Sequence, residues 1–513
     1  MNWADFPSVA RGADGTILAH YAQKSSPSAY SYDVMLVRSA DDGTTWKSLG
    51  RAHDDNTPTE HGFVTLVAQE KGVRAFWLDG RETAGEDGHE GTGAMTLRTA
   101  LVGEDGVMAG ELLDPRVCDC CGTSAAVTSE GPVVVYRNRG EDETRDIWII
   151  GREETGWRTP HPVHADGWKI AGCPVNGPAV AARERRVVVA WYTYAGDRPS
   201  IRVAFSDNAG RSFDRPMEVD RPFGKRAPIG RVDVILDERG EAIVSWIAAE
   251  RDDAMVLARR VTRERRMSEA RPLLSTRAGR NSGFPRMDRL GDSLLLAWTD
   301  AASPSQVRAE LRTAADLPPV SLDATEVNGT TSDLATGLLA AGQPAPTISA
   351  VDLDGKDVDP GHLRKGVVLL TIWATWCEPC RQEQPVLSAL MRQYGEKGLK
   401  IVGLSVDQHL ATQELATIVA RRKIPYTTWH DRMDRASQAL GVGTLPAAFL
   451  IEDGIVRWRQ AGTVKAGDPE LTTALAKALA PRPVRAEQGS RGPVPPARSQ
   501  KPGSGRGPLL PRR

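Results

Sequence analysis

An internal repeat is the feature that most constrains the fold of this 513-residue chain. Each copy has a short strand-like start, an apolar strand that ends in an aromatic residue, and a third strand of alternating polarity. The six starts are at Phe6, Gly62, Ser124, Gly177, Gly230 and Gly283, and the six aromatic residues are Tyr21, Trp77, Tyr136, Trp191, Trp246 and Trp298. A period of roughly 50 residues built from short strands is the signature of a propeller blade. We therefore predict an all-β, six-bladed propeller over residues 1–315, with the aromatic residues packed between neighbouring blades.

Two of the repeats carry a further motif after their third strand. It runs from Ser39 to Trp46 as SADDGTTW and from Ser206 to Phe213 as SDNAGRSF. Asp, Asn and Gly at these positions favour a tight turn, with the aromatic residue expected to be buried under it. The motif resembles the Asp-box repeat of sialidase-like six-bladed propellers. The resemblance implies a folding element that is remote from any active site.

The composition and pattern of the sequence change after the repeats. Residues 316–340 are rich in Pro, Ser, Thr, Gly and Ala, which predicts a linker between domains. Strands alternate with amphipathic helices over residues 341–480, which indicates an α/β domain with helices on both faces of a sheet. Residues 481–513 are basic, rich in Pro and Gly and without periodicity, so we expect a disordered tail.

Composition excludes several classes of function. Sixty-five Lys and Arg residues balance 66 Asp and Glu residues, so the broad basic surface of a nucleic-acid binder is not expected. The longest apolar stretch, Gly366 to Trp376, is about half the roughly 20 residues that a membrane helix needs. Six cysteines are too few for a disulfide scaffold, and they are clustered, so we interpret them as sites.

The cysteines of the α/β domain have the spacing of a dithiol/disulfide couple. Cys377-Glu-Pro379-Cys380 follows an apolar strand and opens a helix, which puts the first sulfur at a helix N-terminus. The unpaired N–H groups there stabilise a thiolate, the attacking species in disulfide exchange. We therefore predict that Cys377 is the nucleophile and that Cys380 resolves the mixed disulfide. A structural disulfide or half of a metal site is the alternative, but this domain has no second cysteine pair.

The segments WATWCEPCRQEQPVL, PAPTISAVDLDGK, KGLKIVGLSVD and GTLPAAFLIEDG closely resemble the TlpA/ResA group of thioredoxin-like oxidoreductases. The resemblance implies a thioredoxin fold that needs no cofactor, acts on protein thiols and disulfides, and works outside the cytoplasm. It also implies that Pro446 is cis beside the cysteine pair and that Trp376 shields the sulfur. The backbone of Thr444 and Leu445 would offer strand-like hydrogen bonds to a substrate.

Two departures from related families affect the chemistry. Thr371 stands six residues before Cys377, where many thioredoxins keep a buried acid. Asp407 is the nearest replacement as a proton acceptor, although the alternative, that Asp407 is only a solvated carboxylate at the end of a strand, is at least as well supported by the sequence. Ala374 stands three residues before Cys377, where a peroxiredoxin needs Thr, so peroxidase activity is disfavoured.

Four cysteines belong to the propeller repeats. Cys118, Cys120 and Cys121 open the third repeat and Cys173 opens the fourth, so neighbouring blades should bring them together. Three readings stay open: two structural disulfides with cross-blade pairing to Cys173, a thiol set serviced by the C-terminal domain, and a soft-metal site for Cu(I) or Zn.

Other polar clusters lie in predicted loops, which contain both binding residues and ordinary polar residues that only contact solvent. They are His53, Asp54, Asp55, Glu60 and His61 in one cluster, and Asp79, Arg81, His89 and Glu90 in the other.

Three functions compete. The first is a thiol-disulfide oxidoreductase whose propeller recruits a substrate or is itself the thiol partner. The second is copper handling by propeller cysteines that the thioredoxin-like domain keeps reduced. The third is a sialidase-type glycosidase, which needs an arginine cluster; Arg81, Arg231 and Arg286 occur at similar blade positions.

The ends of the propeller carry one more expectation. The sixth repeat has room for only three strands, and propellers commonly close the ring with a strand from the N-terminus. The sequence begins with MNWADFPSVARG, which shows neither such a strand nor an export signal. We expect the true start to lie upstream; the alternative is that the linker segment PPVSLDA supplies the closing strand.

Overall fold

The computed structural model describes residues 7–26, 31–83, 93–104, 106–220, 226–250, 253–279, 282–300, 305–323, 338–407, 410–432, 435–442 and 444–480. The described chain up to Leu479 forms one compact unit. The predicted tail and most of the predicted linker lie outside the described residues. Within the described part, no helix is long and apolar enough to cross a membrane.

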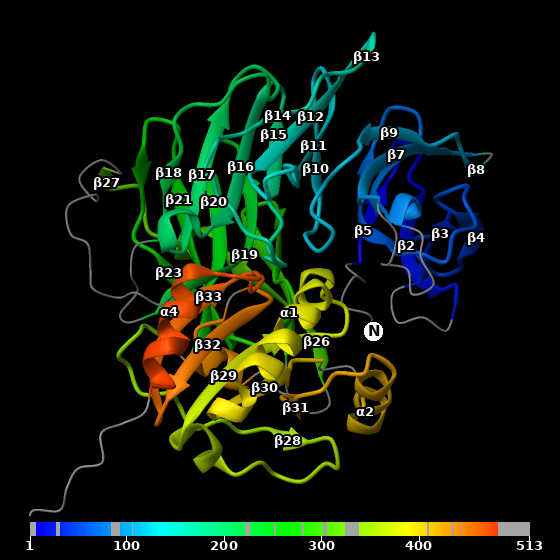
Figure 1. Cartoon of the computed structure of the whole chain (residues 1–513). Helices are drawn as coiled ribbons and strands as arrows, with labels where there is room; N and C mark the ends of the chain where they lie inside the picture. Colours follow the sequence, from blue (N-terminus) through cyan, green and yellow to red (C-terminus); the bar gives the residue numbers. More distant parts are fainter. Residues whose placement is uncertain are drawn as a thin grey trace, which may run out of the picture. The chain divides into compact units, whose positions relative to one another are not determined.

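Six antiparallel sheets follow one another along the first part of the chain and confirm the six-bladed propeller (Figure 1). The first blade has β1 (Val9–Arg11), β2 (Ile17–Lys24), β3 (Tyr32–Ser39) and β4 (Lys47–Arg51). The second has β5 (His61–Ala68), β6 (Val73–Asp79), β7 (Thr96–Gly103), β8 (Gly106–Val107) and β9 (Glu111–Asp114). The third has β10 (Ser124–Thr128), β11 (Gly131–Arg137), β12 (Ile147–Glu153), β13 (Gly156–Trp157) and β14 (His161–Pro162).

The remaining blades repeat this order. The fourth has β15 (Ala179–Arg183), β16 (Arg186–Thr193), β17 (Ser200–Ser206) and β18 (Met217–Glu218). The fifth has β19 (Ala227–Leu236), β20 (Ala242–Glu250), β21 (Asp253–Val261), β22 (Arg266–Met267) and β23 (Arg271–Arg277). The sixth has β24 (Arg286–Leu290), β25 (Ser293–Asp300) and β26 (Gln306–Thr313). Each predicted aromatic residue lies in the second strand of its blade.

These aromatic residues pack against the preceding blade. Trp77, Trp191 and Trp246 are fully buried, each in a core shared with the blade before it. Burying an aromatic side chain in this way is a main source of stability between sheets. Tyr21 is an exception to the prediction, since 41% of it stays exposed. It belongs to the first blade, and among the described residues no preceding blade covers it.

The two turn motifs form as predicted, but the aromatic residue of the first motif is not buried. Asp41 accepts hydrogen bonds from the backbone N–H and the hydroxyl of Thr45, and Asn208 accepts one from the backbone of Ser212. Trp46 was expected to be buried under its turn, yet 46% of it is exposed. Its indole N–H donates to the carbonyl of Gly43 at 3.0 Å, so the ring lies along the turn instead of beneath it.

The linker contributes a strand, but not to the sixth blade. In β27 (Leu322–Asp323) Leu322 pairs with Met267 of β22, at the edge of the fifth blade. The alternative that this segment closes the sixth blade is therefore wrong. The sixth blade has three strands among the described residues.

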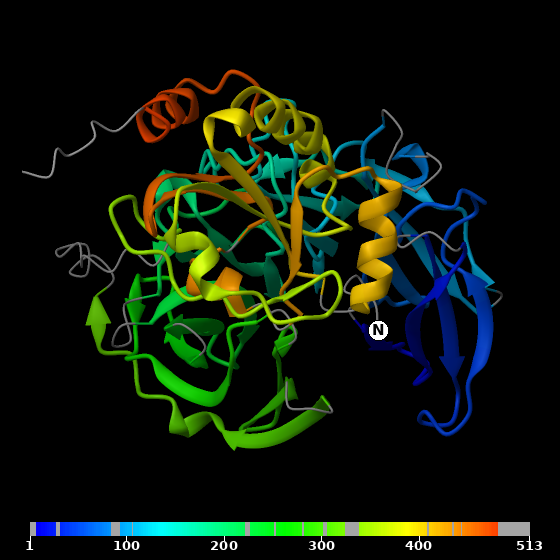
Figure 2. The ribbon, with the colours of Figure 1, turned by 60° about the horizontal axis from the view of Figure 1, so that its bottom comes forward.

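The C-terminal domain is a thioredoxin-like α/β sandwich, as expected (Figures 1 and 2). Its six-stranded sheet has the order β28-β31-β30-β29-β32-β33, in which β29 pairs in parallel with β30 and antiparallel with β32. The strands are β28 (Val351–Asp352), β29 (Val367–Trp373), β30 (Leu399–Ser405), β31 (Thr427–His430), β32 (Ala447–Glu452) and β33 (Ile455–Ala461). The helices are α1 (Glu378–Tyr394), α2 (Thr412–Arg421), α3 (Arg435–Ala439) and α4 (Pro469–Ala478).

Helices cover both faces of this sheet, because the residues of the central strand alternate between two cores. Leu369 belongs to a core with α1 and α4, whereas Leu370 belongs to a core with α2 and α3. The second core also contains Cys377 and Cys380 together with the propeller cysteines. The propeller and the thioredoxin-like domain therefore share one buried core at the cysteines.

Candidate redox site

The two cysteines of the C-terminal domain lie where β29 leads into α1, and they form a disulfide. Cys377 is the N-cap of α1, and its sulfur accepts a hydrogen bond from the backbone N–H of Cys380 at 3.2 Å. Pro379 occupies the first turn, where a helix needs no donor from it. Both cysteines are buried, and so is Trp376, which is 9% exposed.

The loop before Cys377 is held by Asp407. Its carboxylate accepts hydrogen bonds from the backbone N–H of Thr375 at 2.9 Å, from the hydroxyl of Thr375 at 2.7 Å and from the hydroxyl of Ser405 at 2.6 Å. Asp407 is 2% exposed, so the reading of a solvated strand-end carboxylate is wrong. With its oxygens engaged in this way, Asp407 positions the loop that carries Trp376.

Sequence reasoning missed one buried acid of this domain, Glu383. It lies one helical turn beyond Cys380 on α1 and is 1% exposed. Its carboxylate accepts hydrogen bonds from the hydroxyl of Thr371 at 2.8 Å and from the backbone N–H of Val464 at 2.9 Å. Burial raises the pKa of Glu383 to about 7. The buried acid that Thr371 replaces on the strand is thus supplied from the facing helix.

A propeller segment occupies the backbone edge that was expected to bind substrate. The Leu445–Pro446 peptide bond is cis, as the resemblance implies. Leu445 accepts a hydrogen bond from the backbone N–H of Cys173 at 2.5 Å and donates one to the carbonyl of Cys173 at 3.3 Å. Thr463 donates to the carbonyl of Ala171 from its backbone N–H at 3.1 Å and from its hydroxyl at 2.7 Å. Thr444, beside Leu445, is buried.

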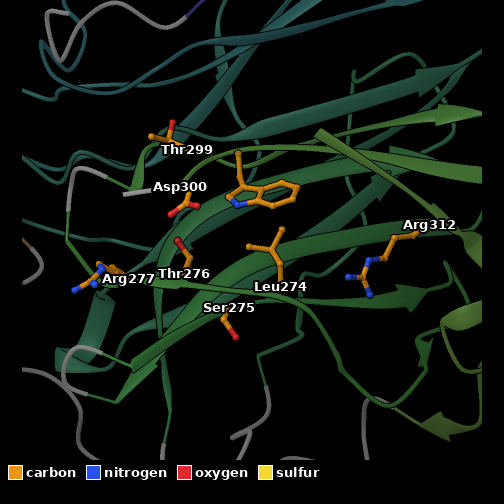
Figure 3. Close-up of a pocket in the computed structure, with 8 residues that line it drawn as sticks. Leu274, Ser275, Thr276, Arg277, Thr299, Asp300 and Arg312 are labelled. Carbon is orange, nitrogen blue, oxygen red and sulfur yellow. The ribbon is translucent and has the colours of Figure 1, made fainter. Parts of the chain in front are cut away.

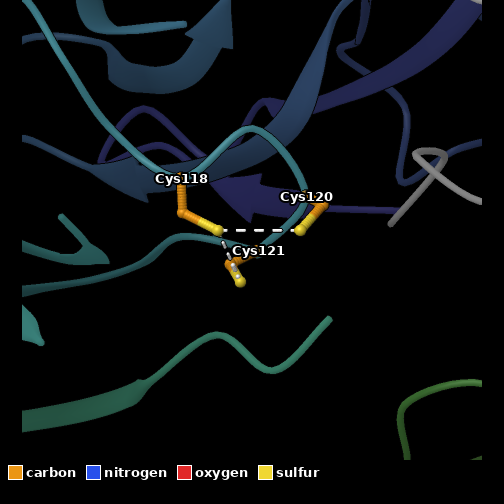
Figure 4. A group of neighbouring side chains, drawn as sticks. All are labelled: Cys118, Cys120 and Cys121. Carbon is orange, nitrogen blue, oxygen red and sulfur yellow. Dashed lines mark hydrogen bonds between the residues drawn. The ribbon is translucent and has the colours of Figure 1, made fainter. Parts of the chain in front are cut away.

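All four propeller cysteines are buried free thiols in the core that contains Cys377. The sulfur of Cys118 lies 3.0 Å from that of Cys121 and 3.6 Å from that of Cys120 (Figure 4). Cys173 belongs to the same buried core as these three cysteines. The four cysteines thus converge as expected, but as free thiols instead of the two disulfides of the first interpretation.

The charge of Arg145 acts on this cluster. Its guanidinium is fully buried and donates to the sulfur of Cys118 at 3.3 Å. Burial alone would raise the pKa of Cys118, but its hydrogen bonds with Cys120 and Cys121 and the charge of Arg145 hold it well below its usual range. Burial raises the pKa of Cys120 and of Cys121. Among Cys118, Cys120 and Cys121, Cys118 is therefore the thiol that ionises first.

The histidines of the first polar cluster lie together between the first two blades. The rings of His53 and His61 stack with centroids 3.8 Å apart, and one oxygen of Asp55 lies 2.8 Å from His53 Nδ1 and 3.2 Å from His61 Nε2. Burial lowers the pKa of His61, but Asp55 and Asp79 outweigh it and raise the pKa. Arg81 pairs with Asp79 at 2.8 Å and with Asp55 at 3.2 Å, so a guanidinium already serves both carboxylates. Two residues of the second polar cluster lie outside the described residues: His89 and Glu90.

The glycosidase reading gains no support from its arginines. Arg81 is paired as above, Arg231 donates to the carbonyl of Gly279 at 3.0 Å, and Arg286 lies 3.7 Å from Asp233. Each has a protein partner near a junction between blades, as structural arginines do.

A pocket of about 440 Å³ opens beside the fifth and sixth blades (Figure 3). It is lined by Leu274, Ser275, Thr276, Arg277, Trp298, Thr299, Asp300 and Arg312. Its lining contains no cysteine, so it is separate from the redox site.

The fold and the cysteine pair define a thioredoxin-like protein with a C-x-x-C disulfide at the start of a helix. A family model described as the AhpC/TSA family matches residues 341–459. The thiol-disulfide oxidoreductase ResA of Bacillus anthracis is 34% identical over 116 residues, which are 22% of this chain and 66% of that protein. The ResA of Geobacillus thermodenitrificans is 32% identical over 131 residues, which are 25% of this chain and 74% of that protein.

Among solved structures, a putative thiol:disulfide interchange protein DsbE from Chlorobium tepidum is similar, at 28% identity and a TM-score of 0.26. The match covers 28% of this chain and 99% of that one. The chain spans just under two thirds of the length of the Bacillus relative and about three quarters of the Geobacillus relative. The Geobacillus match, at 32% identity over 74% of that protein, shows that the chain belongs to the ResA family of thiol-disulfide oxidoreductases.

Proposed function

We propose that this protein is a thiol-disulfide oxidoreductase in which the Cys377–Cys380 couple exchanges with thiols of its own propeller. The observation that carries the proposal is the pairing of Cys173 with Leu445, next to the cis proline. In thioredoxin-like domains this edge offers strand-like hydrogen bonds to a substrate, and here the paired residue is itself a cysteine.

The exchange needs no cofactor. The Cys173 thiolate attacks the sulfur of Cys377, the Cys377–Cys380 bond breaks, and Cys380 leaves as a thiolate. The Cys120 thiolate then attacks the sulfur of Cys173 and releases Cys377. Two electrons pass from the propeller to the C-terminal couple, and each attacking thiol loses the proton that a leaving thiolate gains. The reverse sequence reduces a propeller disulfide.

Glu383 supports proton movement in this scheme. Its pKa of about 7 lets it hold or release a proton near neutral pH, one turn beyond Cys380. External protein thiols or disulfides are the proposed partners of the overall reaction. Cys377 and Cys380 are buried. External partners therefore reach this couple only after the Cys173 segment moves, or by exchange through the propeller thiols.

Trapping tests the proposal. Cys380→Ser combined with Cys120→Ser in the full chain, incubated with oxidised glutathione, should accumulate a Cys173–Cys377 disulfide, because both thiols that could resolve it are absent. Peptide mass spectrometry identifies the crosslink. The matched control adds Cys173→Ser to these two changes, which should abolish that crosslink and leave only glutathione on Cys377. A Cys380→Ser, Cys120→Ser variant that carries only glutathione on Cys377 contradicts the proposal.

Metal handling is a second candidate function. Cys118, Cys120 and Cys121 bring three ligand sulfurs within 4.8 Å of one another in a buried site. Thiolates of this kind favour Cu(I) or Zn. Elemental analysis of the purified protein should then show one metal ion per chain, absent in Cys118→Ser.

We also infer that the protein works outside the cytoplasm, where disulfides persist. The cysteine couple with four further thiols beside it supports this location. Fractionation of the cells that produce the protein should place it outside the cytoplasm; recovery in the cytoplasmic fraction contradicts the inference.

A further inference from the structure

The propeller contains a second pair of cysteines at the spacing of the first. Cys118 and Cys121 form a C-x-x-C pair in the loop between β9 and β10, the same spacing that carries the Cys377–Cys380 disulfide. Their sulfurs are 3.0 Å apart, whereas a disulfide bond measures about 2.05 Å. The pair therefore needs to close by only about 1 Å to form a bond.

The environment of Cys118 is that of an attacking thiolate. Arg145 is permanently charged, and its Nη1 donates to the Cys118 sulfur from a fully buried position. Glu143 holds the other end of this guanidinium at 2.8 Å, and Asp119 lies 3.4 Å from Nη1. A buried cation fixed against a sulfur stabilises the thiolate and so activates it.

Cys118 is also placed between two other thiols. Its sulfur is 3.0 Å from that of Cys121 and 3.6 Å from that of Cys120 (Figure 4). Burial raises the pKa of Cys120, and the thiols of Cys118, Cys121 and Cys173 raise it further. Cys173 in turn is paired with Leu445 of the C-terminal domain. Three of the propeller sulfurs are therefore contiguous, and Cys173 and the C-terminal couple belong to the same buried core.

We propose that Cys118 and Cys121 are a second redox-active centre, which receives the disulfide that the C-terminal couple passes to the propeller. The proposal rests on the function proposed above, which supplies the Cys120–Cys173 disulfide. The Cys118 thiolate attacks the sulfur of Cys120, and Cys173 leaves as a thiolate. The Cys121 thiolate then attacks the sulfur of Cys118, and Cys120 leaves as a thiolate.

The balance of the two steps is complete. The Cys120–Cys173 bond is broken and the Cys118–Cys121 bond is formed, so no external oxidant enters. The protons lost by Cys118 and Cys121 are taken up by Cys120 and Cys173. The net result is that the propeller stores the disulfide away from the docking edge, and Cys173 is free for another exchange.

Disulfide mapping of the full chain tests this. The protein is reduced in the presence of a chelator, oxidised with glutathione redox buffers, and alkylated after denaturation. Tandem mass spectrometry of the tryptic peptide from Val117 to Arg137 then locates the alkylated cysteine. We expect Cys120 and Cys173 to be alkylated while Cys118 and Cys121 are joined. In Cys121→Ser the disulfide should instead involve Cys120.

Two further variants test the role of Arg145 as a positioning residue. Arg145→Lys keeps the charge but cannot keep the same hydrogen bond, so formation of the Cys118–Cys121 disulfide should slow about tenfold and need a higher pH. Arg139→Lys is the matched control, because Arg139 bonds to the same Glu143 at 2.8 Å. The control should keep the rate and the pH profile of the unchanged protein.

Three outcomes overturn the inference. A trapped Cys173–Cys377 crosslink in a protein whose Cys118 and Cys121 stay open to alkylation rejects the second centre alone. If Cys118 and Cys121 are protected from alkylation, the peptide mass shows no loss of two hydrogens, and a stronger chelator makes them reactive, the pair is a metal site and not a disulfide. A failed crosslink in the Cys380→Ser, Cys120→Ser variant, together with an unchanged protein that never forms Cys118–Cys121, rejects both proposals.

Discussion

Glu383 shows how a single buried acid links the fold to pH. Burial raises its pKa from the usual 4.5 to about 7, so the folded protein holds this proton more tightly than the unfolded chain does. Its contribution to stability is therefore fully present below about pH 4.5 and is lost as the pH rises through about 7. A shift of this size corresponds to about 3 kcal/mol between the two ends of that window.

Glu383→Gln should remove this pH dependence. The amide keeps a partner for Thr371 but carries no titrating proton, so the free energy of unfolding should change less between about pH 5 and about pH 8 than in the unchanged protein. Urea unfolding at both pH values measures it, and the rate of disulfide exchange should also lose its inflection near neutral pH. Glu396→Gln, in an exposed turn after α1, is the control. Equal pH slopes in both variants would speak against a buried proton on Glu383.

At this scale, the cysteines were predictable and the acid was not. Cys377 and Cys380 are identified by spacing and by their place between a strand and a helix. Glu383 sits among other polar residues in RQEQPVL, where no single position stands out. The available signal was its spacing of four from Leu387, which is fully buried on the same face of α1.

At the scale of elements, the segment from Ala171 to Cys173 joins the two domains because one residue in it has no side chain. A Cβ atom on Gly172 would lie 2.6 Å from the carbonyl oxygen of Leu445. That separation is too short for a carbon and an oxygen, and the contact is with backbone that cannot rotate away. Glycine at this position is therefore needed for Cys173 to pair with Leu445.

Gly172→Ala should loosen the docked segment and expose the disulfide. Each lost backbone hydrogen bond costs about 1 kcal/mol, so losing the two Cys173–Leu445 bonds should raise the open population by about tenfold or more. The rate at which a small thiol reduces the Cys377–Cys380 disulfide, followed by alkylation and mass spectrometry, should be higher in this variant than in the unchanged protein. Gly103→Ala is the matched control, since a Cβ there meets nothing within 4 Å. Identical rates in the two variants would show that the segment does not cover the disulfide.

The elements themselves were largely predictable, and their edges were not. Alternation and the recurring aromatic residue identify each blade, because both follow from how one strand faces its neighbours. The pairing of β27 with the fifth blade, and the exposed ring of Tyr21, depend on which sheet edges and faces are covered in the folded chain. Those are long-range properties that a local pattern does not contain.

At the scale of the whole molecule, the two domains meet in a core that belongs to neither alone. Cys173 and Val175 from the propeller pack in the same cluster as Trp376 and Leu445 from the thioredoxin-like domain. Sequence predicted two domains and a set of converging thiols, but not that the thiols would lie in this shared core. A core shared by two domains couples their unfolding, since opening one exposes apolar surface of the other.

We therefore expect the full chain to unfold in a single cooperative transition in calorimetry, with equal calorimetric and van't Hoff enthalpies. Gly172→Ala should separate this into two transitions, because it weakens the junction without touching the interior of either domain. The control Gly103→Ala, on a hairpin of the second blade, should keep one transition. Two transitions in the unchanged protein would mean that the shared core contributes too little free energy to hold the domains together. Cys377 would then be buried only in the docked state of the two domains.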